Sequence, residues 1–256
     1  MVQSKILSGL RIDGIKEDNY PVRRFVEKNK VLTLCFSASF VICIIYVLMS
    51  NHEELCPQLW VWFNLLFQLS VGFIINYIFY ITQIYIPQYK HNKEANMCIA
   101  VRIDCIVRHM RDIFSQLGLK YTGEYDENNI TKEYCTELLR KLNIDDRVSV
   151  INVRRMYSTK VEKESYFTVK EWIISRIEFV ESEADKIMKY YAPYINYELM
   201  KTLERILQSA MHQNMARSFL QSPVGISFDS CNDDVFLEPY YTLMKKLEEM
   251  SLQYKE

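Results

Sequence analysis

Two long stretches without a charged residue dominate the hydrophobic pattern of the chain. They cover residues 31–49 and 59–86, and only the short polar segment 50–58 separates them. Uncharged, mostly apolar runs of roughly 18 residues or more are typical of helices that cross a membrane. We therefore predict a transmembrane helical hairpin over residues 31–87, preceded by a polar arm over residues 1–30 with one short helix from Val22.

The second uncharged stretch contains polar residues at helical spacing. At about 100° per residue they fall within a sector of roughly 120°. The set is Asn64, Gln68, Gly72, Asn76, Thr82 and Gln83, with Ser70 on the other side. Because polar side chains that face lipid lose their hydrogen bonds, this stripe predicts contact with another polar surface. Two interpretations stay open: hydrogen bonds between copies in a homo-oligomer, and the lining of a pore made by several copies.

Small residues and one proline refine the predicted hairpin. Cys35, Ser39 and Cys43 recur at four-residue spacing in the first stretch, which favours close approach of a second helix. Pro87 follows the second stretch, where proline either ends a helix or introduces a hinge. We expect the first stretch to be retained as a signal-anchor, because about 30 residues precede it and no A-x-A-like cleavage site follows it.

The pattern changes to that of a helical bundle over residues 88–256. Apolar residues recur in heptad-like stripes through residues 99–117 and 173–191, and shorter stripes cover 199–210 and 240–254. This period predicts amphipathic helices, one starting near Lys93 and broken at Gly118, and one covering 198–215. Thr168 and Glu171 fit a capping box, and Thr131 fits a helix N-cap. Residues 145–167 are assigned as a connector with either β spacing or a short helix. Because all the other predicted elements are helices, the predicted fold class is all-α.

The charges define an orientation and a compartment. Seven Lys and Arg residues precede the first stretch, Lys90 and Lys93 follow the second, and segment 50–58 has none. By the positive-inside rule, both ends of the chain are expected in the cytoplasm. The seven cysteines are scattered without metal-ligand spacing, which favours reduced thiols and predicts no metal or cofactor.

The search for chemistry yields basic clusters but no catalytic motif. Phosphate-binding, zinc-protease and hydrolase motifs are absent from the sequence, so we predict no enzyme. Residues 91–256 carry more acidic than basic side chains, which argues against general nucleic-acid binding. Two clusters still suit a phosphate-bearing ligand, with a solvated face or a subunit contact as the alternative. They are Arg102, Arg108 and Arg111 beside His109, and Arg154, Arg155, Lys160 and Lys163 with interleaved aromatics.

The two uncharged stretches followed by heptad helices resemble the compact two-span effectors of bacterial anti-phage defence. In size and plan the chain is similar to the channel effector of Hailong-type systems. That resemblance implies a tetrameric channel in the bacterial inner membrane, controlled by short nucleic-acid oligomers from a partner nucleotidyltransferase. We therefore expect a homo-oligomeric membrane effector that contacts lipid, its own copies, and a nucleotide, nucleic-acid oligomer or cognate sensor protein.

Two other functions remain as alternatives. The first is a membrane-tethered binding or scaffold protein without conductance. The second is a membrane-anchored ribonuclease similar to the HEPN family, because Arg102 and His109 have the spacing of that family's Arg-x4–6-His motif. Ile103 stands where that family has a polar residue, which puts this alternative in doubt.

Overall fold

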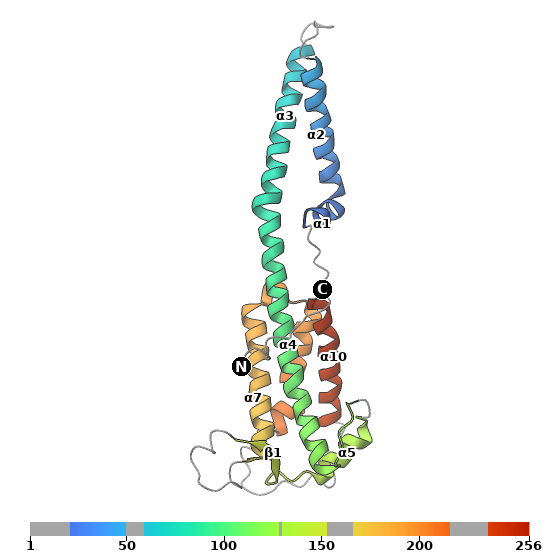
Figure 1. The fold of residues 1–256 in the computed structure, drawn as a ribbon, viewed down its shortest axis with the longest axis vertical. Helices are drawn as coiled ribbons and strands as arrows, with labels where there is room; N and C mark the ends of the chain where they lie inside the picture. The colour runs from blue at the N-terminus through green and yellow to red at the C-terminus, as the bar shows by residue number, and fades with distance from the viewer. Residues whose placement is uncertain (1–20, 50–58, 128–129, 153–165, 216–234, 256) are drawn as a thin grey trace, which may run out of the picture. The chain divides into compact units, whose positions relative to one another are not determined.

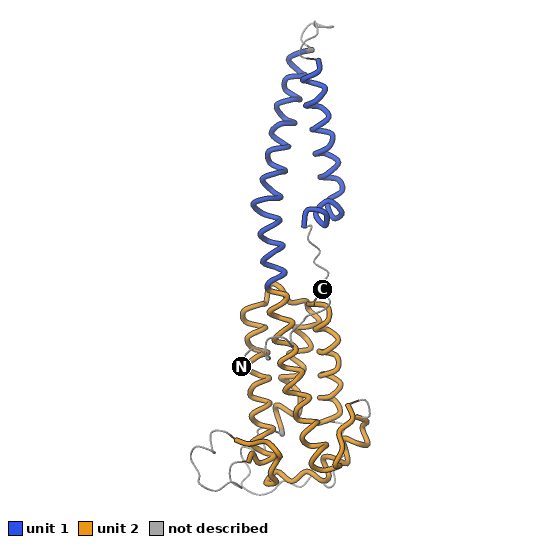
Figure 2. Tube along the Cα trace, viewed as in Figure 1, with its two compact units in different colours: residues 1–94 blue, residues 95–256 orange. Residues whose placement is uncertain are grey.

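The computed structural model describes residues 21–49, 59–127, 130–152, 166–215 and 235–255 (Figure 1). Nearly all of these residues are helical, which confirms the all-α class. The chain divides into two compact units, Met1–Glu94 and Ala95–Glu256 (Figure 2).

Unit 1 is a helical hairpin with a short helix at its base. Helix α1 covers Pro21–Lys28, α2 covers Lys30–Met49 and α3 covers Leu59–Phe79, with α2 and α3 packed side by side (Figure 1). The helix predicted from Val22 is therefore confirmed. Two helical stretches among the described residues, Lys30–Met49 and Trp60–Tyr121, are long and apolar enough to cross a membrane by length and composition.

The second stretch does not end at Pro87. A π-helical turn, η1 (Tyr80–Tyr85), follows α3, and α4 (Ile86–Tyr121) continues from it. The prediction of a new helix near Lys93 is thus wrong. Proline lacks an N–H and crowds the carbonyl four residues earlier. The wider π turn relieves this crowding, as the Ile86 N–H donates to the carbonyl oxygen of Ile81, five residues back.

Aromatic packing holds α1 against the base of the hairpin. Phe25 is fully buried, and its ring centroid lies 4.7 Å from that of Tyr85 and 5.8 Å from that of Tyr77. The Arg24 guanidinium lies 6.0 Å from the centre of the Tyr89 ring. Such contacts contribute about 0.5–1.5 kcal/mol each beyond area burial, so α1 belongs to the hairpin and is not a free arm.

Unit 2 is a bundle around one apolar core. Its helices are the greater part of α4, α5 (Lys132–Lys141), α7 (Val169–Tyr190), α8 (Tyr197–Leu207) and α10 (Leu237–Lys255). The predicted stripe of α4 is confirmed, because all of its members are fully buried: Ile99, Ile103, Ile106, Met110, Ile113 and Leu117. Both hydrogen bonds of the capping box between Thr168 and Glu171 are present, and the Thr131 hydroxyl accepts from the Tyr134 N–H.

Two predicted boundaries in unit 2 require correction, and the connector takes the β alternative. The connector contains β1 (Arg147–Ile151) and β2 (Tyr166–Thr168), which pair antiparallel with Arg147 opposite Thr168. The helix predicted over 198–215 ends at Leu207, where the Gln213 side chain donates to the Leu207 carbonyl, and the π-helical turn η5 (Met211–Met215) follows a short break. Gly118 does not end α4, since the helix runs three residues further to Tyr121.

Gly118 is instead required by packing. A Cβ at this position would overlap the Tyr134 hydroxyl oxygen and lie 3.2 Å from the Glu124 carbonyl oxygen. We predict that Gly118→Ala destabilises the fold, because overpacking costs about 1–3 kcal/mol and outweighs the gain of about 1 kcal/mol in helix propensity. The measurement is chemical unfolding of the full-length protein in detergent micelles.

A second substitution tests the named contact. The Tyr134 hydroxyl is buried without a hydrogen-bond partner, so Tyr134→Phe alone should change stability little. Combined with Gly118→Ala, it should recover part of the lost stability, since it removes the overlapping atom. A Gly118→Ala variant as stable as the original chain would contradict the packing argument.

Candidate functional site

The inner face of the hairpin is aromatic. On α2, the Tyr46 ring stacks on Phe67 at 4.1 Å and on Trp60 at 5.1 Å, and the Phe36 ring stacks on Tyr77 at 4.3 Å. Ser70 is buried at 5% exposure, in line with its place outside the polar stripe. Ser39 and Cys43 are half-buried whereas Cys35 is exposed, so only part of the small-residue stripe is covered within the hairpin.

The polar stripe of α3 divides into satisfied and unsatisfied members. Half-buried Asn64 accepts a hydrogen bond from the Tyr46 hydroxyl at 3.4 Å. The Thr82 hydroxyl donates to the carbonyl oxygen of Ile78 at 2.9 Å. The amide oxygen of Asn64 and the hydroxyl of Thr82 therefore each have a partner inside one copy of the chain.

The remaining members form what we call the open amide set: Gln68, Asn76 and Gln83. These side chains are exposed, lie on the side of the helix away from α2, and make no hydrogen bond among the described residues. Gly72 lies among them, and a Cβ there would meet no atom within 4 Å. Sequence periodicity places these residues on one face of the helix, but it could not show that Asn64 and Thr82 are bonded locally.

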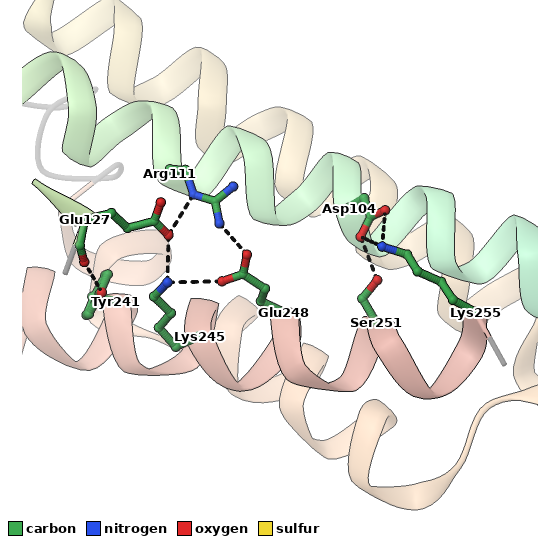
Figure 3. Close-up of polar contacts among 8 residues, drawn as sticks. All are labelled: Asp104, Arg111, Glu127, Tyr241, Lys245, Glu248, Ser251 and Lys255. Atoms are coloured by element: carbon green, nitrogen blue, oxygen red, sulfur yellow. Dashed lines mark hydrogen bonds and ion pairs between the residues drawn. The ribbon is translucent and has the colours of Figure 1, made fainter. Parts of the chain in front are cut away.

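The arginines predicted to hold a ligand do not converge. On one side of α4, Arg102 pairs with Glu183 of α7. On the other side, Arg111 pairs with Glu127 and with Glu248 of α10 (Figure 3). The second predicted cluster, Arg154, Arg155, Lys160 and Lys163, lies outside the described residues.

The ion pairs of Arg102 and Arg111 shift the protonation of their acidic partners. Burial alone would raise the pKa of Glu183, but hydrogen bonds from Lys186 and Arg102 hold that pKa below its usual value. Glu248 follows the same logic, with Arg111 and Lys245 lowering its pKa against the effect of burial. Both arginines are therefore committed to carboxylates within the chain and are not open to a phosphate.

His109 contacts α7 through stacked groups. Its Nδ1 lies 2.6 Å from Nη1 of Arg176, and its ring centroid lies 3.7 Å from that of Phe179. The Arg176 guanidinium in turn lies 3.8 Å above the Trp172 ring. Burial and then the Arg176 charge lower the pKa of His109. The two residues of the HEPN-like spacing thus each contact a different side chain of α7.

A buried hydrogen-bond chain links three helical elements of unit 2, and sequence reasoning missed it. His212 of η5 has a fully buried side chain, with Nδ1 3.1 Å from Oε1 of Glu181 and Nε2 3.0 Å from the Tyr240 hydroxyl. Burial lowers the pKa of His212, against the opposing effect of Glu181, and it raises the pKa of Tyr240. The three residues are far apart in sequence, so no spacing motif indicates this chain.

No family model, curated protein or solved structure matches the chain. Among the described residues, no group of His, Cys, Asp and Glu side chains is arranged to hold a metal ion. The polar face of α3 is the candidate functional surface.

The two histidines predict how stability depends on pH. Because their folded-state pKa values lie below the ordinary value of 6.5, the folded chain binds fewer protons than the unfolded chain. Stability should therefore fall as the pH drops below about 6.5 and level off once both histidines are protonated in the folded state. We expect a lower melting temperature at pH 5.5 than at pH 7.5, with a smaller difference in His109→Gln. An equal difference in the variant would show that His109 does not contribute.

Proposed function

We propose that the chain is a homo-oligomeric membrane effector whose copies associate through the polar face of α3, and that this face lines or gates an ion pathway. The observation that carries the proposal is the open amide set. Gln68, Asn76 and Gln83 are exposed on the side of the hairpin away from α2 and have no hydrogen-bond partner in the described chain.

The cost of this arrangement favours several copies over one. Moving an amide from water to hydrocarbon without a hydrogen-bond partner costs about 4–8 kcal/mol of free energy. A hairpin that served only as an anchor would gain stability from leucine at these positions. In an oligomer, the amides bond to other copies or to water between them, so the same residues become favourable.

The π-helical turn adds a means of gating. Thr82 and Gln83 lie within η1, and Pro87 lies two positions after its last residue, Tyr85. π-Helical turns inside α-helices occur often at functional sites. We therefore assign η1 and Pro87 as the hinge that changes the direction of the polar face.

The physiological setting follows from the resemblance to two-span anti-phage effectors. We propose action at the bacterial inner membrane with both ends of the chain in the cytoplasm, assembly as a tetramer, and control by a nucleotide, a nucleic-acid oligomer or a sensor protein. The open amide set is the feature of this chain that supports assembly from several copies.

We predict that the combined variant Gln68→Leu, Asn76→Leu and Gln83→Leu loses ion flux while remaining in the membrane, because the pathway loses its polar lining. Flux is measured with a potential-sensitive dye in expressing bacteria and with purified protein in liposomes. The matched control is Asn64→Leu, whose amide is bonded inside the hairpin. Unchanged flux in the triple variant would refute the pore, and absence of flux from the original chain would favour the scaffold alternative.

We further predict that Gly72→Cys forms a disulfide between copies under mild oxidation, in a background without the native cysteines. Gly72 lies on the proposed meeting face in open space, so a thiol there is accessible to a second copy. Ser70→Cys is the matched control, because Ser70 is buried on the other side of the same helix. Equal cross-linking at both positions, or none at Gly72, would contradict association through this face.

A further inference from the structure

A groove runs along unit 2 between α4 and α10, which pack antiparallel. Asp104 contacts Ser251 and Lys255, whereas Arg111, further along α4, contacts Glu248, which lies earlier in α10 (Figure 3). The groove has a volume of about 570 Å³ and opens to the surface. Val107 and Leu252 provide its apolar lining.

Almost every charge in the groove is paired within the chain. Glu127 and Glu248 each contact both Arg111 and Lys245, with the Lys245 ammonium 2.7 Å from Glu127 and 3.2 Å from Glu248 (Figure 3). Asp104 accepts from Lys255 at 2.8 Å. Among the charged residues that line the groove, only Arg108 and Glu249 make no ion pair in the described part of the chain.

These two unpaired charges lie at the same level of the bundle. The contacts of Asp104 with Ser251 and of Arg111 with Glu248 bracket both residues, Arg108 on α4 and Glu249 on α10. Both side chains are exposed, and neither reaches the other within ion-pair distance. Exposed apolar side chains accompany them, since Leu252 is 61% exposed and Val101 of α4 is 62% exposed.

One cation and one anion at equal height make this surface complementary to itself. A two-fold axis parallel to the helices would bring Arg108 of one copy against Glu249 of the next, and the same contact would form a second time by symmetry. An anionic ligand fits less well, because Arg111 and Lys245 are already bound to carboxylates and Glu249 would repel it.

We propose that the α4/α10 groove of unit 2 is an interface between two copies of this chain, with Arg108 and Glu249 as reciprocal contacts across it. The inference rests on the proposed function only in taking a second copy as the occupant. It adds a contact outside the apolar helices, which fixes the register of neighbouring copies.

Charge reversal tests the proposal in the full-length protein in detergent micelles. Arg108→Glu alone and Glu249→Arg alone each place like charges at both contacts, so each should weaken self-association about tenfold or more. An equimolar mixture of the two differently tagged variants places opposite charges at both contacts and should restore association. Tag pull-down and light scattering measure this, and Arg140→Glu, on the exposed face of α5, is the control for a change in net charge.

The mixture separates an interface between copies from a contact inside one copy. If Arg108 and Glu249 acted within one chain, the double variant would recover association but the mixture of single variants would not. That outcome, or normal association of both single variants, would overturn the proposal. Cross-linking through Gly72→Cys in the same samples reports on α3 separately. If that cross-link persists while the charge reversals have no effect, the groove is not the interface but the proposed function stands.

Discussion

A polar group that cannot reach water must find a hydrogen-bond partner, and this constraint determines which surfaces of the molecule are complete. In unit 1, the Tyr46 hydroxyl satisfies Asn64, and the backbone carbonyl of Ile78 satisfies Thr82. Phe25 and the surrounding tyrosines close the base of the hairpin. The amides on the side of α3 away from α2 remain without partners in the described chain. The polar groups of the hairpin are therefore bonded on the side toward α2 but not on the opposite side.

The π-helical turn before Pro87 follows from the same requirement. An α-helix that continued through Pro87 would leave the Gln83 carbonyl without its donor and in contact with the proline ring. By shifting to bonds five residues back, as in the bond from Ile86 to Ile81, the chain keeps its helical direction. The resulting π-helical turn is wider than an α-helical turn and has weaker hydrogen bonds. It lies where the polar face ends. Backbone chemistry thus places the π-helical turn at the end of the polar face, where Thr82 and Gln83 lie.

Local patterns in the sequence indicated the buried faces of the helices, but neither all of the helix boundaries nor the partners of each helix. Heptad spacing identified the core residues of α4, such as Ile103 and Met110, because burial follows directly from helical period. The capping box at Thr168 was also predicted from the sequence, because both of its hydrogen bonds join residues three positions apart. The ion pairs could not be predicted from the sequence, because Arg102 and Arg111 lie on one helix but contact different neighbouring helices. The hydrogen-bond chain of Glu181, His212 and Tyr240 likewise joins segments that are far apart in sequence. The α4 sequence alone does not indicate which helix lies on each side of it.

The polar face of α3 carries neutral amides, whereas the α4/α10 groove of unit 2 carries two unpaired charges among its described residues. In hydrocarbon, a charged side chain at the helix centre costs about 2.5–3.5 kcal/mol or more. Neutral amides would therefore cost less free energy than charges as contacts between helices there. At an exposed groove, an ion pair contributes only about 0.2–1 kcal/mol. In the proposed interface, Arg108 and Glu249 would therefore add little affinity, but a mismatched pair would place like charges together at a larger cost. In the proposed assembly, association strength would therefore come from the polar face of α3, and the groove of unit 2 would select the orientation in which copies meet.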